Sequence, residues 1–131
     1  SRKSDTGFVA LTLRQASGKL ATLERRTVEE LDDYRAMPTE AEIARRQPEA
    51  LTARQRVHLQ RYGYPYILDD YHFHMTLTDR ISRPETLADV MADELCNTIG
   101  TAELTVSDLV LFRQEGPQAR FHILRRFPLL P

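Results

Sequence analysis

The chain has 131 residues, of which 41% are hydrophobic and 28% are charged, so it suits one globular domain spanning residues 1–131 rather than a disordered chain. A net charge of -1 argues against an extended nucleic-acid surface and against electrostatic binding to an anionic membrane. No apolar run approaches the roughly 20 residues that span a bilayer, and the single cysteine, Cys96, fits a reducing compartment. We therefore expect a cytoplasmic protein.

The first elements expected are a strand and a long helix. Residues 7–13 (Gly-Phe-Val-Ala-Leu-Thr-Leu) read as a strand that starts abruptly after a chain start without methionine. Apolar side chains then recur every three to five residues from Leu20 to Tyr34, which indicates an amphipathic helix that Met37 and Pro38 bring to an end.

Three further helix starts share one signature, a hydroxyl residue followed three positions later by Glu or Gln. The pairs are Thr39 with Glu42, Thr52 with Gln55, and Ser82 with Glu85. In such a capping box the hydroxyl accepts a bond from a free backbone N–H and the longer side chain returns to the cap. Gly63 and Gly100 are placed to end the second and third of these helices. The last helix should bury Leu87, Val90, Met91, Leu95 and Ile99 on one face.

The remaining segments predict strands at 66–78, 103–112 and 120–127, with a hairpin-like loop at 114–118 between the last two. Strands interleaved with helices and followed by a hairpin indicate an α+β fold. We expect a mainly antiparallel sheet with helices packed on one face. The other face could stay open and hold a site.

Residues 71–78 (Tyr-His-Phe-His-Met-Thr-Leu-Thr) alternate, so His72, His74, Thr76 and Thr78 should share one face of a strand. Three interpretations compete. The face could simply be solvated, or His72 and His74 could bind zinc with ligands from elsewhere in the chain. Alternatively, a histidine exchanges a proton with a phosphate ester while a threonine hydroxyl holds a phosphoryl oxygen.

A resemblance favours the phosphate chemistry. His74-Met75-Thr76-Leu77 is similar to the His-x-Thr-x motif of the two-histidine (2H) phosphoesterase superfamily, which includes cyclic phosphodiesterases and 2′-5′ RNA ligase-like proteins. The wider series resembles the branch of that superfamily named for phosphonate metabolism. It consists of 51–55 (Leu-Thr-Ala-Arg-Gln), 61–66 (Arg-Tyr-Gly-Tyr-Pro-Tyr), 73–78 and 126–129 (Arg-Phe-Pro-Leu).

The resemblance implies two similar lobes, each with one His-x-Thr motif, so that two histidines face one another as acid and base. This chain holds one such motif, since neither His58 nor His122 has Ser or Thr two places on. We therefore expect it to correspond to the C-terminal lobe, together with the last strand of the first lobe at about 7–13. A site that holds both the acid and the base would then need its second histidine from elsewhere.

The resulting hypothesis is a metal-independent phosphodiesterase, without cofactor, that acts on a cyclic phosphate ester in the intact protein. His74 and Thr76 would be its catalytic residues, and the resemblance implies as substrate either a small phosphorylated sugar from phosphonate breakdown or an RNA end. Arg45, Arg46 and His72 are candidate substrate-binding residues, because an arginine fork suits a phosphate or phosphonate oxyanion. Two alternatives remain open: a non-catalytic fragment that forms a homodimer through its exposed sheet face, and a zinc hydrolase using His72 and His74.

Overall fold

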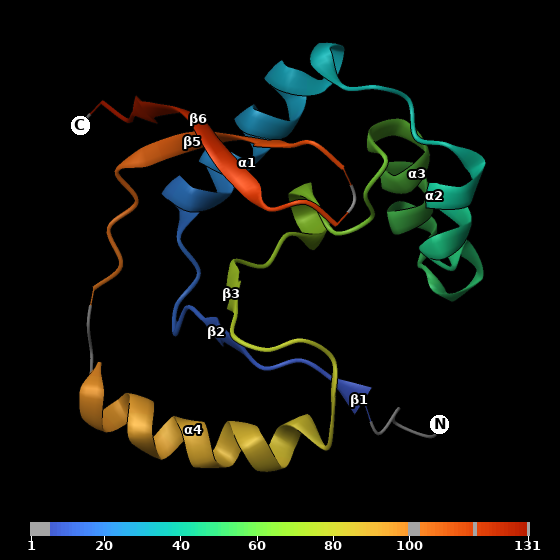
Figure 1. Cartoon of the computed structure of the whole chain (residues 1–131). Coiled ribbons are helices and arrows are strands. Elements are labelled where there is room, and N and C mark those ends of the chain that lie inside the picture. Colours follow the sequence, from blue (N-terminus) through green and yellow to red (C-terminus); the bar gives the residue numbers. More distant parts are fainter. Residues whose placement is uncertain (1–5, 100–102, 117, 131) are drawn as a thin grey trace. The chain divides into compact units, whose positions relative to one another are not determined.

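The computed structural model describes residues 6–99, 103–116 and 118–130 (Figure 1). The chain divides into two compact units, Ser1–Ala88 and Asp89–Pro131. The division falls within helix α4, which spans Pro84–Thr98. Each unit is described by itself below.

The three α-helices that lie wholly within the described part of the first unit each begin at a hydroxyl side chain that accepts a hydrogen bond from the first turn. They are α1 (Gly18–Leu31), α2 (Glu40–Arg45) and α3 (Ala53–Tyr62), with the short 3-10 helices η1 (Asp32–Tyr34), η2 (Pro48–Ala50) and η3 (Leu68–Asp70). Two of the three predicted capping boxes, at Thr39 and Thr52, are confirmed, and in each the hydroxyl accepts from the N3 backbone while the N3 side chain accepts from the cap backbone. Gly63 ends α3 with a left-handed φ of 74°, and its N–H donates to the Leu59 carbonyl, as predicted.

The strands of the first unit are short and form two antiparallel ladders. They are β1 (Thr6–Gly7) with β4 (Ile81–Ser82), and β2 (Ala10–Thr12) with β3 (His74–Thr76). The predicted strand at 66–78 is therefore mostly wrong: η3 occupies its first part, and only three of its residues pair with another strand. Leu68 takes a left-handed φ of 55°, which turns the backbone away from an extended path.

Few side chains of the first unit are fully enclosed. The buried hydrophobic side chains are Val9, Leu51, Leu59 and Ile67, of which Leu59 is the least exposed at 1%, and Pro65 is fully buried as well. Val9 directly precedes β2, Leu51 directly follows η2, Leu59 lies within α3, and Ile67 directly precedes η3.

Helix α4 differs from its prediction at its start and along its apolar face. Ser82 pairs with Thr6 in the β1–β4 ladder, and the helix begins at Pro84, so the capping box expected at Ser82 is wrong. Pro84 suits a first helical position because that position needs no backbone donor. Val90 and Ile99, expected to be buried, are 61% and 46% exposed, whereas Leu87, Met91 and Leu95 are partly buried. The helix end expected at Gly100 lies outside the described residues.

The second unit contains a β-hairpin. Strands β5 (Asp108–Gln114) and β6 (Phe121–Pro128) pair antiparallel, with a register shift between Leu111 and Phe112. Strand β6 agrees closely with its predicted range of 120–127, whereas β5 begins five residues later than the expected start at 103.

Short antiparallel sheets together with four α-helices confirm the predicted α+β class. Within the described residues the strands form three separate two-stranded sheets rather than the single sheet that was expected. No helix in the described part of the chain combines the length and the apolar character needed to cross a bilayer.

Candidate functional site

Strand β3 carries the two predicted catalytic residues on one face. His74 lies opposite Thr12 of β2, and Thr76 lies opposite Ala10. Residues two apart on a strand project from the same face, and directly opposed residues share that face. His74 and Thr76 are both exposed, so a ligand in solvent can reach them.

Two contacts fix the His74 ring. Its Nδ1 lies 2.9 Å from the backbone carbonyl oxygen of His72, and its centroid lies 6.1 Å from that of the Phe8 ring at a tilt of 35°. A carbonyl oxygen can only accept, so Nδ1 is the donor and carries the proton. In the neutral imidazole, Nε2 is then the basic nitrogen, and it can take a proton from a bound molecule.

The threonines of the alternating stretch have different roles. Thr78 uses its hydroxyl within the fold, since its Oγ1 accepts from the Val9 N–H at 3.0 Å. The Leu77 N–H donates to the Val9 carbonyl at 2.8 Å, which extends the contact between the two segments. Thr76 makes no side-chain hydrogen bond to another described residue, so its hydroxyl is available to a ligand.

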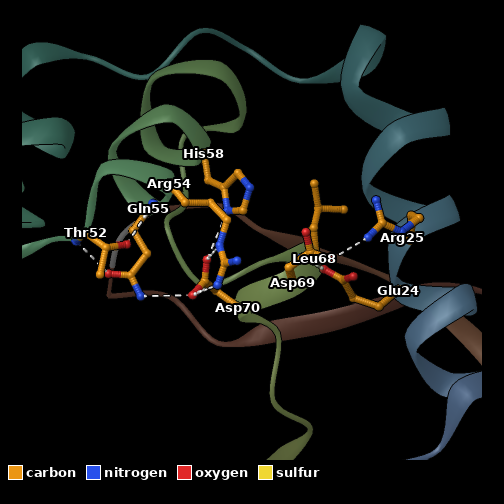
Figure 2. A network of polar contacts seen from close by, with 9 residues as sticks. All are labelled: Glu24, Arg25, Thr52, Arg54, Gln55, His58, Leu68, Asp69 and Asp70. Carbon is orange, nitrogen blue, oxygen red and sulfur yellow. Dashed lines mark hydrogen bonds and ion pairs between the residues drawn. The ribbon is translucent and has the colours of Figure 1, made fainter.

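A polar network holds η3, the segment just before the histidines (Figure 2). Asp70 accepts two hydrogen bonds from Arg54 of α3, at 2.7 Å from Nε and 3.0 Å from Nη2. The side-chain amide of Gln55 donates to the same carboxylate at 3.3 Å, while Gln55 also completes the capping box with Thr52. These hydrogen bonds connect the start of α3 to Asp70, which precedes His74 by four residues.

Helix α1 holds the other side of the same segment. The Leu68 N–H donates to the Glu24 carboxylate at 3.1 Å, and Arg25 pairs with Asp69 at 2.9 Å. These contacts stabilise the left-handed backbone of Leu68, a conformation that costs a branched residue about 1 to 2 kcal/mol. The approach to β3 is therefore fixed from two helices (Figure 2).

Hydrogen bonding and burial shift the pKa values of side chains in this region. The hydrogen bonds from Arg54 lower the pKa of Asp70, against the opposing effect of burial. Burial raises the pKa of Tyr71, and the nearby Glu24 charge adds to that increase. His58 of α3 is buried beside Asp70, with its Nδ1 3.7 Å from Asp70 Oδ2, too far for a hydrogen bond.

The predicted arginine pair is placed at the end of α2. Arg45 is its last residue and is exposed, whereas the Arg46 guanidinium lies 4.7 Å from the centroid of the Tyr64 ring in a cation–π contact. Among the hydrogen bonds and ion pairs of the described residues, none joins Arg45 or Arg46 to the β3 histidine or threonine. The structure thus places His74 beside the His72 carbonyl and Thr76 on the same strand, whereas Arg46 contacts Tyr64 and Arg45 is exposed at the end of α2.

The carboxylate anchor was not predicted from the sequence. Asp70 precedes His74 by four residues, and Gln55 was predicted only as part of the capping box with Thr52. Acidic residues directly before a histidine-rich strand were the available signal, but pairing with Arg54 depends on tertiary structure. Within the described part of the chain, no three or more His, Cys, Asp or Glu side chains form a group that could hold a metal ion.

The structure thus defines an α+β protein whose candidate site is a histidine and a threonine side by side on a short strand. A family model described as "Protein of unknown function (DUF1045)" matches residues 2–122. The chain belongs to this family.

One curated relative is similar over most of this chain. It is the "Ribose 1,5-bisphosphate phosphokinase PhnN" of Janthinobacterium sp. (strain Marseille), which is 34% identical over 126 residues. The match covers 92% of this chain and 28% of the relative, so the chain spans little more than a quarter of that protein's length. No solved structure matches the chain.

Proposed function

We propose that this chain supplies one acid/base histidine and one phosphate-binding threonine to a metal-independent phosphodiesterase of the 2H type. The substrate is a cyclic phosphate ester, either of a small phosphorylated sugar or at an RNA end. The observation that carries the proposal is the hydrogen bond from His74 Nδ1 to the His72 carbonyl. That bond leaves Nε2 as the proton acceptor beside the free Thr76 hydroxyl.

In the proposed hydrolysis, His74 Nε2 takes a proton from water while the water oxygen bonds to phosphorus. The bond between phosphorus and one ester oxygen breaks, and that oxygen must receive a proton from a second acid. The Thr76 hydroxyl donates to a non-bridging oxygen and holds the phosphoryl group in place. The second acid is a histidine of another His-x-Thr motif, in keeping with the resemblance to two-lobed enzymes.

The relative's name supports a phosphorylated sugar as the substrate class, but it does not support the phosphodiesterase reaction. A ribose bisphosphate is a phosphorylated sugar, which agrees with the smaller of the two proposed substrates. A phosphate-binding loop of the form Gly-x-x-x-x-Gly-Lys-Ser/Thr does not occur in this sequence, and the match leaves 72% of the relative outside it. We therefore carry over the sugar phosphate and not the phosphokinase activity. The single cysteine supports a cytoplasmic location.

The proposal is tested by following the histidine ring protons of the chain by NMR. A 2′,3′-cyclic nucleotide, inorganic phosphate and zinc are titrated separately into the parent chain and into the His74→Gln, Thr76→Val and His122→Gln variants. His122 is an exposed histidine of the second unit and serves as the matched control. The phosphates are expected to shift the His74 signals in the parent and in His122→Gln, and Thr76→Val should weaken that binding several-fold.

Other outcomes would refute the proposal in favour of a named alternative. Joint broadening of His72 and His74 with stoichiometric zinc, and no response to phosphate, would support the zinc hydrolase. No response to any of the three probes, together with a dimeric mass by analytical ultracentrifugation, would support a dimerising module.

A further inference from the structure

A cavity of about 380 Å³ adjoins the candidate site within the first unit. It lies between the end of β2, the start of α1 and the segment that leads into β3. Its lining includes Thr12, Leu13, Ser17, Leu20, Tyr71 and His72. The volume falls within the roughly 300 to 1,000 Å³ that is usual for small-molecule sites.

The cavity lining is hydroxylic and apolar. Of the lining residues, Thr12, Ser17 and Tyr71 have a hydroxyl group and His72 has an imidazole, so each of these side chains can donate or accept a hydrogen bond. The other lining side chains are aliphatic or aromatic, and none of the residues that line the cavity is Asp, Glu, Lys or Arg. Such a surface suits a neutral ring with several hydroxyl groups and does not suit a second charged group.

Two of the lining residues connect the cavity to His74. Thr12 lies directly opposite His74 in the β2–β3 ladder, and His72 supplies the carbonyl that accepts from His74 Nδ1. Thr12 makes no side-chain hydrogen bond to any other described residue. Ser17 uses its oxygen to accept from the Leu20 N–H at 3.3 Å, which leaves its hydroxyl proton for a ligand.

We propose that this cavity binds the sugar ring of the phosphate ester, with hydroxyl groups of a pentose-sized ring facing Thr12, Ser17, Tyr71 and His72. This inference rests on the proposed function, because it places the phosphate at His74 and Thr76. It goes further by assigning substrate selectivity to β2, α1 and the segment 71–73. A phosphorylated sugar should then bind more tightly than phosphate alone.

The test compares ribose 5-phosphate with inorganic phosphate as NMR probes of His74. Ala16 also lines the cavity and is exposed in the loop before α1, so Ala16→Phe narrows the cavity without changing the strand that carries His74. Ala41→Phe, on an exposed position of α2, is the matched control for an added ring. Ala16→Phe is expected to weaken ribose 5-phosphate at least fivefold, with inorganic phosphate unchanged, and Ala41→Phe should change neither.

Thr12→Val provides a second variant of nearly equal size should Ala16→Phe fail to fold. It should weaken ribose 5-phosphate several-fold and leave inorganic phosphate unaffected. Equal affinity of the parent chain for the two probes would overturn the sugar cavity and leave the proposed function standing. The same conclusion holds if neither Ala16→Phe nor Thr12→Val changes the ratio of the two affinities. No His74 response to either probe in the parent chain would overturn the proposed function and this inference together.

Discussion

Replacing Leu59 by alanine tests whether α3 is the structural support of the candidate site. Leu59 is 1% exposed and is the most deeply buried of the four apolar core residues of the first unit. A buried Leu→Ala change costs about 2 to 5 kcal/mol, which combines lost transfer free energy with a residual cavity. Because only four hydrophobic residues are buried in the described part of the chain, the structure around position 59 should partly collapse into the space left by the substitution. We therefore expect a loss of about 2 to 3 kcal/mol in the free energy of unfolding.

The measurement is urea unfolding followed by far-UV circular dichroism. With a urea m-value of about 1 to 3 kcal/mol/M, the midpoint should fall by roughly 0.7 to 3 M. Val57→Ala is the matched control, because Val57 lies on the same helix and is 58% exposed, so its midpoint should change little. Equal midpoints for the two variants would refute the assignment of Leu59 to the core and the view that α3 supports the site.

Further predictions concern the left-handed backbone at Gly63, the loss of stability at acidic pH and the helix cap at Thr52. Gly63→Ala should lower the free energy of unfolding by about 1 to 2 kcal/mol because its φ is left-handed, whereas Gly18→Ala, with open space around its Cα, should not destabilise in the same urea assay. The folded pKa of Asp70 lies below its unfolded value of about 3.9, so Asp70 contributes stability above that pH and loses it as the pH falls through the folded pKa. Asp70→Asn should therefore flatten the decline of the urea midpoint below about pH 4, and the exposed Asp33→Asn should flatten it less. Thr52→Ala should cost about 1 kcal/mol through loss of the capping box, and an unchanged midpoint would show that the box contributes nothing.

The elements predicted correctly are those set by local chemistry. The capping boxes at Thr39 and Thr52 and the left-handed Gly63 depend on residues three or four positions apart, and the structure confirms them. The hairpin also follows from local signals, since its two strands flank a loop with Gly116. Where residues within one helical turn determine the backbone conformation, that conformation can be predicted from the sequence alone.

The predictions that failed depend on contacts between distant residues. The stretch 66–78 has the composition of a strand, but Arg54 and Glu24, from two different helices, hold its first part in a 3-10 turn. Ser82 has the signature of a cap, but pairing with Thr6 draws it into a ladder. For the site, the alternation predicted that His74 and Thr76 share a face, whereas the partner of Nδ1 could not be predicted because the path of the backbone at residue 72 was not known.

The acceptor for His74 Nδ1 is a main-chain oxygen, and this has an evolutionary consequence. Every amino acid at position 72 presents a carbonyl, so no side-chain replacement there can remove the acceptor that sets the His74 tautomer. Position 72 is thus free to vary in size and polarity while the proton-accepting nitrogen of His74 stays the same. A lineage could change the molecules it accepts through residue 72 and inherit its acid/base group intact.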